Sequence, residues 1–188
     1  MPTAQRLNPT LTAFIEKQPV FFVATAGRDG RVNVSPKGMG GMLHVVDRNK
    51  IVWLNVTGSG NETAAHVQEN GRMTLMFCAF EGDALILRVY GNANVLHPHD
   101  AGWDEAITRF PETAGNRQIF SLDIDLVQTS CGTGVPLMDF VKSRGEDELL
   151  PFYEDMGRDG VRDYWKRKNL ETIDGEPTGL LPSTTAAG

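Results

Sequence analysis

The chain contains 188 residues, of which 40% are hydrophobic and 22% are charged, with 18 basic side chains against 24 acidic ones. Domains usually contain about 100 to 150 residues, so this length favours a single domain built on one core. The net charge of −6 argues against a nucleic-acid-binding surface as the main function, because such surfaces need a basic excess. A local site for a single anion stays open.

The cysteine count and the N-terminal residues indicate the cellular compartment of the protein. Cys78 and Cys131 are too few and too far apart for a disulfide scaffold or a four-ligand zinc site, which fits a reducing compartment. Residues 1–6 contain no apolar run that could act as a signal peptide, and no stretch of about 18 uncharged apolar residues occurs. We therefore expect a soluble, cytoplasmic protein without a membrane or nucleic-acid partner.

Residues 8–56 predict one helix followed by four short strands. Asn8 is suited to cap a helix that Pro9 opens and that ends at Lys17. Residues 27–30 carry a hairpin signal, and residues 47–50 form a polar turn. The predicted strands cover residues 20–25, 31–36, 42–46 and 51–56.

The middle of the chain predicts a helix between two groups of strands. Ser59 to Glu62 matches a capping box and Gly71 is a stop signal, so we expect a helix over residues 62–70. Gly91 indicates a bulge in the second of the strands that follow. These strands cover residues 73–80, 84–95 and 120–126, and residues 98–110 are predicted to be helical.

The C-terminal quarter has a different composition. Beyond Asp139, charged residues with scattered aromatic ones predict a helical extension, and the tail 175–188 is expected to be loosely held. Six or seven short strands without a long repeat predict a mainly β (α+β) fold, a small antiparallel barrel with peripheral helices. We divide the chain into a barrel, residues 1–139, and a helical extension, residues 140–188, of the same domain.

The most informative segment is residues 32–38. If it is a strand, its period of two places Asn33, Ser35 and Lys37 on one face and Val32 and Val34 on the other. A hydroxyl and an ammonium would then project together, which suits an anionic ligand. A solvated strand edge explains the same pattern, because lysine is mostly exposed.

A second segment, residues 57–66, could bind a phosphate at the start of a helix. Its glycines allow backbone amides to approach a ligand, and a helix N-terminus offers unpaired N–H groups. It is neither a Walker loop nor a dinucleotide fingerprint, because no Gly-Lys-Ser/Thr follows and Thr63 replaces the last glycine. A capped helix after a tight loop explains the segment equally well.

Together these segments resemble the pyridoxamine 5′-phosphate oxidase-like flavoproteins, whose fold is an FMN-binding split barrel. The resemblance covers about residues 11–136 and lies in the order of the motifs. They are Phe21-Phe22-Val23-Ala24-Thr25, Val32-Asn33-Val34-Ser35-Pro36-Lys37, the Thr/Gly/Ser loop, Ala65-His66, Glu69-Asn70-Gly71-Arg72 and Val89-Tyr90-Gly91. Within that family, residues 58–66, 77–82 and 131–136 are similar to an uncharacterised bacterial branch.

The resemblance implies FMN bound at the interface of a homodimer. It places the phosphate between the strand around Ser35 and Lys37 and the loop-to-helix residues Ser59, Gly60, Asn61 and Thr63. It implies that Val34, Asn55 and Val56 lie along the ribityl chain and ring, that Arg88 lies beside the flavin, and that the segment from Cys131 contacts the flavin of the partner subunit.

Three departures from the oxidases argue against pyridoxamine phosphate as the substrate. The oxidases carry an Arg-Lys pair where this chain has Thr63-Ala64, and a glutamine where it has Ile86. Their C-terminal Arg-x-His element is missing from residues 152–188. A phosphate here would therefore depend on Lys37, hydroxyls and backbone amides.

The other polar residues have simpler explanations. His97 and His99 could be metal ligands, but Pro98 and Asp100 fit a loop that enters a helix, and no third clear ligand accompanies the two histidines. Cys131 lacks a recognisable base, which favours a packing role over a nucleophilic one. Asp123 and Asp125 alternate with apolar residues and fit a solvated strand face.

We therefore expect an FMN-dependent oxidoreductase that acts on a small organic substrate, with no catalytic residue identified, since a flavin carries the redox chemistry itself. Two alternatives stay open. One is a non-catalytic protein that stores or senses flavin or haem on the same barrel. The other is a reductase that uses a deazaflavin in place of FMN.

Overall fold

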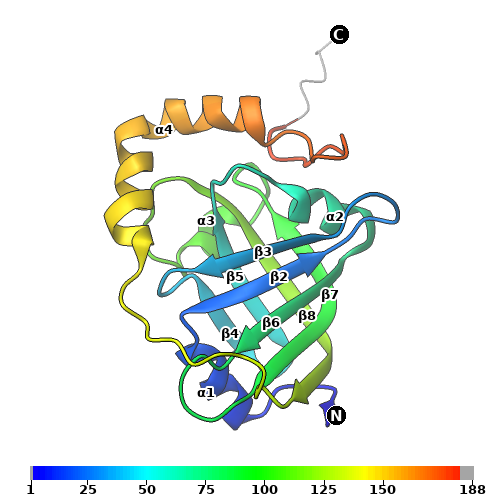
Figure 1. Cartoon of the computed structure of the whole chain (residues 1–188). Helices are drawn as coiled ribbons and strands as arrows, with labels where there is room; N and C mark the ends of the chain where they lie inside the picture. The colour runs from blue at the N-terminus through cyan, green and yellow to red at the C-terminus, as the bar shows by residue number, and fades with distance from the viewer. Residues whose placement is uncertain (1, 183–188) are drawn as a thin grey trace.

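The computed structural model describes residues 2–182 (Figure 1). The barrel elements are strands β1 to β8 and helices α1 to α3, and the C-terminal elements are the π-helical turn η1 and helix α4. In chain order they are β1 (Thr3–Ala4), α1 (Pro9–Lys17), β2 (Val20–Thr25), β3 (Asn33–Gly38), β4 (Leu43–Asp47), β5 (Lys50–Val56), α2 (Glu62–Asn70), β6 (Arg72–Cys78), β7 (Ile86–Leu96), α3 (Trp103–Ile107), β8 (Asn116–Ser130), η1 (Gly145–Leu149) and α4 (Leu150–Lys168).

The strands form one curled antiparallel sheet in the order β3-β2-β6-β7-β8-β5-β4, and β1 pairs with β8 beside this path. Within residues 2–182 the two end strands, β3 and β4, do not pair with each other. The sheet is therefore a split barrel, as predicted. The two-residue strand β1 had no sequence signal, because it is too short to show any alternation.

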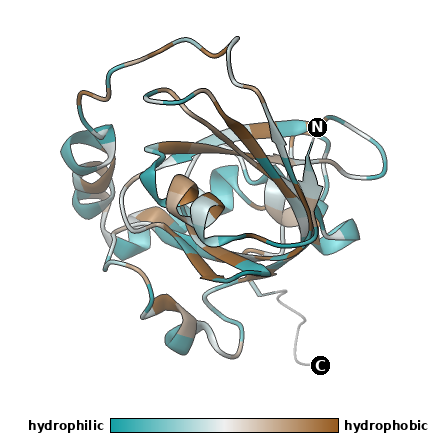
Figure 2. Ribbon diagram, turned by 90° about the horizontal axis from the view of Figure 1, so that it is seen from below, coloured by the Kyte–Doolittle hydropathy of each residue, from teal (hydrophilic) through white to brown (hydrophobic). Residues whose placement is uncertain are grey.

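Aromatic and aliphatic side chains fill the inside of the barrel. Trp53 stacks on Phe120 with ring centroids 4.6 Å apart, and Phe21 stacks on Phe77 at 5.7 Å. Hydrophobic segments lie along the strands around this interior (Figure 2). Burying one such side chain contributes about 1.5 to 3 kcal/mol, so this cluster is the main source of the barrel's stability.

The first helix begins at its predicted cap and the second ends at its predicted stop signal. The Leu11 amide donates to Asn8 Oδ1 at 2.9 Å, and α2 ends at Gly71, which has a φ of 69°. The predicted capping box is wrong, because Asn61 and not Ser59 precedes α2. The Asn61 side chain caps nothing, since its Nδ2 donates instead to the Asn169 carbonyl at 3.2 Å.

Two predictions in the second half of the sheet have different outcomes. The bulge at Gly91 is confirmed, since the β7–β8 register shifts there and a Cβ would lie 2.0 Å from the Asp123 carbonyl oxygen. The helix predicted over residues 98–110 is reduced to α3. Gly102, with a φ of 90°, holds a turn before it, and Pro111 disfavours helical backbone just after it.

The C-terminal extension contains the predicted helix, but the described part of its tail makes ordered contacts. Helix α4 bends at Gly157 (φ 66°, ψ 171°), so it runs along one side of the barrel and then across its end (Figure 1). Thr178 and Leu180 are buried, and Thr178 Oγ1 donates to the Asn169 carbonyl at 2.5 Å. The expectation of a loose tail is therefore wrong for residues 175–182, and residues 183–188 lie outside the described part. Composition alone could not show these contacts.

Candidate functional site

A cleft of about 2070 Å³ opens between the barrel and the C-terminal extension. We call its two sides the barrel wall and the extension wall. The barrel wall includes β3, the end of β5, the loop 57–61 and the start of α2, and it continues to the end of α1 and the start of β2. The extension wall consists of the segment 138–149, α4 and the turn that follows it.

Strand β3 supplies the first part of the barrel wall. Its burial alternates as predicted, with Asn33, Ser35 and Lys37 turned inward and Val34 outward. Asn33 Nδ2 donates to Thr63 Oγ1 at 3.1 Å, which ties β3 to α2. Ser35 Oγ is buried and has no hydrogen-bond partner among the described residues. A free hydroxyl is therefore held at the cleft.

Lys37 is a cation in unfavourable surroundings. Its ammonium lies 5.6 Å from the centre of the Trp53 ring. Burial, with a smaller contribution from the nearby Arg117 guanidinium, lowers the Lys37 pKa to about 8, and Glu62 opposes this only partly. An anion in the cleft would relieve both effects, because opposite charge favours the protonated lysine.

The loop 57–61 and the first turn of α2 complete the barrel wall. A Cβ built at Gly58 would meet nothing within 4 Å, so the backbone there is open to a ligand. No side chain of the described residues caps α2. The N–H groups of its first turn therefore give this end of the helix a partial positive charge. Asn55 is buried below the loop, where its Nδ2 donates to Gln118 Oε1 at 3.2 Å.

Arg117 of β8 also lines the cleft, and sequence reasoning missed it. Its side chain is buried, and its Nη1 donates to the carbonyl oxygens of Gly60 at 2.9 Å and Gly58 at 3.4 Å. Burial lowers the Arg117 pKa to about 10, against the opposing influence of Tyr153, Glu62 and Tyr164. The only signal was a charged residue at the start of β8, a stretch that the prediction left outside the strand.

The extension wall fastens the loop from the other side. The Tyr153 hydroxyl donates to the Thr57 carbonyl oxygen, and Trp165 Nε1 donates to Thr57 Oγ1 at 2.7 Å. Asn169 Nδ2 donates to the Gly58 carbonyl oxygen at 2.9 Å, while the Asn169 carbonyl accepts from Asn61. These contacts hold the loop in one conformation, yet none of the extension residues was predicted to belong to the site.

The structure brings together most of the residues that the sequence singled out. The predicted residues that line the cleft are Ser35, Lys37, Asn55, Val56, Ser59, Gly60, Asn61 and Thr63. Val34, Arg88 and Cys131 do not line it. Val34 and Arg88 lie on the outer face of the sheet, where Arg88 Nη1 donates to Ser130 Oγ at 3.1 Å, and Cys131 is exposed just beyond β8.

The remaining polar candidates lie outside the cleft. The rings of His97 and His99 stack 5.5 Å apart, and burial lowers the His97 pKa to about 4. Asp123 pairs with Lys50 at 3.0 Å on the outside of the sheet. Residues 2–182 contain no cluster of three metal-ligating side chains and no helix long and apolar enough to cross a bilayer.

Comparisons with known proteins agree with this architecture. A family model described as pyridoxamine 5′-phosphate oxidase matches residues 7–131. The pyridoxamine 5′-phosphate oxidase family protein ustO of Aspergillus flavus is 34% identical, in an alignment that covers 92% of this chain and 76% of that protein.

Two solved structures share the fold at low sequence identity. HupZ of Group A Streptococcus has a TM-score of 0.50 and 17% identity, over 71% of this chain and 99% of that one. A pyridoxamine 5′-phosphate oxidase-related, FMN binding protein from Nostoc punctiforme has a TM-score of 0.50 and 15% identity, over 69% and 88%. The chain therefore belongs to the pyridoxamine 5′-phosphate oxidase family.

Proposed function

We propose that the protein is an FMN-dependent oxidoreductase that binds the cofactor phosphate on the barrel wall and a small organic substrate above it. The observation that carries the proposal is a set of three groups at the cleft that would each be stabilised by an anion. Ser35 Oγ has no partner among the described residues, the start of α2 is uncapped, and Lys37 has a lowered pKa. Together these groups fit a phosphate, because hydroxyls, helix amides and a lysine all favour an anion.

The other residues of the cleft suit the rest of such a cofactor. Asn55 and Val56 continue the wall beyond the phosphate groups and would lie along the ribityl chain and ring. A cleft of about 2070 Å³ exceeds the roughly 300 to 1,000 Å³ of a common small-molecule site, which leaves room for a substrate beside a cofactor. The flavin, when bound, would supply hydride transfer, and the chain would orient it and exclude water. The printed description of the Nostoc relative as FMN binding supports this assignment.

The departures from the oxidases, above all the missing C-terminal Arg-x-His element, make pyridoxamine phosphate an unsuitable substrate in this proposal. At Thr63-Ala64, where the oxidases carry an Arg-Lys pair, Thr63 Oγ1 accepts a hydrogen bond from Asn33 and Ala64 is fully buried, so neither position offers the cofactor phosphate a cation. The substrate is therefore proposed only as a small organic molecule that the extension wall could contact.

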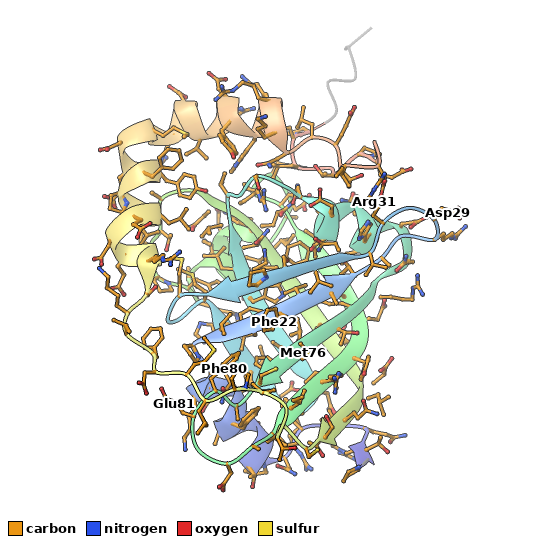
Figure 3. The ribbon with its side chains drawn as sticks, viewed as in Figure 1. Phe22, Asp29, Arg31, Met76, Phe80 and Glu81 are labelled. Carbon is orange, nitrogen blue, oxygen red and sulfur yellow. The ribbon has the colours of Figure 1, made fainter. Side chains whose placement is uncertain are left out.

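The proposed enzyme is a homodimer that buries the outer face of the sheet. Phe22 and Met76 are paired in register and lie side by side on this face (Figure 3). Val34 is 60% exposed on the neighbouring strand. In such a dimer Arg88 and Cys131 would reach the flavin held by the partner, which accounts for their position away from this cleft. A monomeric mass by light scattering at micromolar concentration would contradict the dimer.

The first test is the visible spectrum of the purified protein. We expect bound or added FMN to give a perturbed flavin band and to raise the melting temperature, because a ligand that binds only the folded state stabilises it. A colourless protein without a thermal shift in FMN would refute the proposal.

A second test concerns turnover. Oxidation of NADPH or NADH by the FMN-loaded protein must be faster than by free FMN; otherwise the protein binds flavin without turnover. A deazaflavin added in competition identifies the preferred cofactor.

A further inference from the structure

Arg117 is a buried guanidinium whose charge is not matched by a protein carboxylate. Its side chain is 2% exposed, and none of the ion pairs within residues 2–182 includes it. Its Nη1 donates to two loop carbonyls, whereas its Nε is buried and has no hydrogen-bond partner among these described residues. Carbonyl oxygens satisfy donors but do not neutralise a cation, and a buried charge without a counterion is costly.

A second cation faces the same cleft. Lys37 and Arg117 both line the cleft, and the Arg117 guanidinium contributes to the lowered pKa of Lys37, so two positive charges face the same space. Glu62 is the acidic group that favours both charged forms, but it forms an ion pair with neither. One carboxylate at a distance leaves an excess of positive charge here. This excess of positive charge favours an anionic ligand in the cleft.

We propose that Arg117 binds the phosphate of the cofactor together with Lys37. This inference deepens the proposed function and depends on it for the identity of the ligand, but not for its charge. A phosphomonoester carries about −1.5 to −2 charge at pH 7 and so matches two cations. Arg117 thereby supplies, from β8, the positive charge that α2 lacks at Thr63-Ala64.

The position of Arg117 also links the ligand to the loop. The same guanidinium that would contact the phosphate donates to Gly58 and Gly60, whose loop leads into α2. Guanidinium groups present several donors in a fixed plane, so one arginine can hold the loop and an anion simultaneously. A lysine at this position would keep the charge but lose that geometry.

The test compares FMN with riboflavin, which lacks the phosphate, in the full-length protein. Arg117→Met removes the charge, and Arg117→Lys keeps it. Arg48→Met is the matched control, because Arg48 Nε also donates to a backbone carbonyl, that of Leu7, and does not line the cleft. Dissociation constants come from quenching of flavin fluorescence, and melting curves check the fold.

We expect Arg117→Met to weaken FMN about 10- to 100-fold and to change riboflavin less than twofold. Arg117→Lys should fall between Met and the wild type, and Arg48→Met should match the wild type. Equal losses for FMN and riboflavin would overturn the proposal, because Arg117 would then be a loop support only. An unchanged affinity for FMN would overturn it as well.

A separate titration with inorganic phosphate distinguishes this inference from the proposed function. If the wild type binds neither flavin but is stabilised by phosphate, and Arg117→Met abolishes that effect, the anion site is supported and the flavin assignment fails. If the wild type responds to neither flavin nor phosphate, both proposals fail.

Discussion

The two walls of the cleft are built in different ways. The barrel wall follows local rules: β3 alternates its side chains with a period of two, and α2 begins and ends within nine residues of its own sequence. The extension wall depends on contacts between distant residues, since Tyr153 and Asn169 reach Thr57 and Gly58 across 96 and 111 residues of chain. Local pattern therefore reveals one side of a site, whereas the side made by distant contacts needs the folded structure.

The family comparison divides the molecule at nearly the same place. The family model ends at residue 131, so α4 and its tail lie beyond the part that the family model describes. The barrel wall carries the groups proposed for the cofactor, and the extension wall supplies Phe152, Tyr164 and Arg167 to the remaining space. We expect the extension wall to tune binding and the barrel wall to provide it.

The largest expected effect is a loss of stability on truncating a side chain of the barrel core, compared with one in the extension. Phe120→Ala should lower the free energy of unfolding by about 3 to 5 kcal/mol, because it leaves a cavity beside Trp53. The control is Phe140→Ala at an exposed position between β8 and α4, which should stay within about 0.5 kcal/mol. Urea denaturation measures both, and similar losses would contradict the assignment of stability to the barrel.

Lys37 tests the barrel wall directly. Lys37→Ala should weaken FMN by about 1.5 to 3 kcal/mol, the usual contribution of a hydrogen bond to a charged group. Lys50→Ala, at an exposed ion pair with Asp123, serves as the control and should leave the affinity unchanged. An unaltered dissociation constant for Lys37→Ala would move the phosphate to another part of the cleft.

The pH dependence of binding follows from the same lysine. In the free protein the Lys37 pKa is lowered from 10.5 to about 8, so above pH 8 the ammonium loses its proton and the attraction for phosphate disappears. We expect the FMN affinity to fall by up to tenfold per pH unit above about pH 8, because binding must then take up a proton. Lys37→Ala should abolish this slope; a slope that persists in the variant would assign the titration to another group.

The same lysine makes the stability of the apo protein rise with pH, whereas it makes the FMN affinity fall. The folded state binds this proton less tightly than the unfolded state, so the unliganded protein gains stability as the pH rises from about 8 towards 10.5. Denaturation of the apo protein at pH 7 and pH 9.5 checks the direction, and Lys37→Ala supplies the reference without this contribution.

The smallest expected effect tests the extension wall. Asn169→Ala removes the donor to the Gly58 carbonyl and should weaken FMN by about 0.5 to 1.5 kcal/mol, because the loop is then held less firmly. Asn94→Ala, on an exposed part of β7, is the matched control. If Asn169→Ala weakened FMN more than Lys37→Ala, the extension and not the barrel would be the main binding element.

Sequence reasoning predicted the fold well because most elements carry their own signals. Strand β2 and helix α2 match their predicted bounds, and the bulge at Gly91 follows from a glycine where a Cβ would collide with the neighbouring strand. It failed where local and distant contacts compete. Asn61, and not Ser59, directly precedes α2, and its side chain donates to the extension instead of capping the helix; Thr178 is buried although the tail is rich in residues typical of loops.

The candidate site was predicted only in part, for the same reason. The period of two identified the inward face of β3, but no local pattern indicates that Arg117 lines the same cleft as Lys37 or that Trp165 donates to Thr57. Such pairings arise when β8 and α4 are placed against the loop. The aromatic residues of the extension are typical of packing positions, and here Tyr153 and Trp165 use their polar atoms to fix the loop.

The central claim is that a cofactor phosphate lies between the barrel wall and Arg117. A crystal structure of the protein grown with FMN tests it most directly. We predict the phosphate within hydrogen-bond distance of Ser35 Oγ, the Lys37 ammonium and the Arg117 guanidinium, at the start of α2. A flavin phosphate bound elsewhere, with these three groups still free of an anion, would contradict the claim.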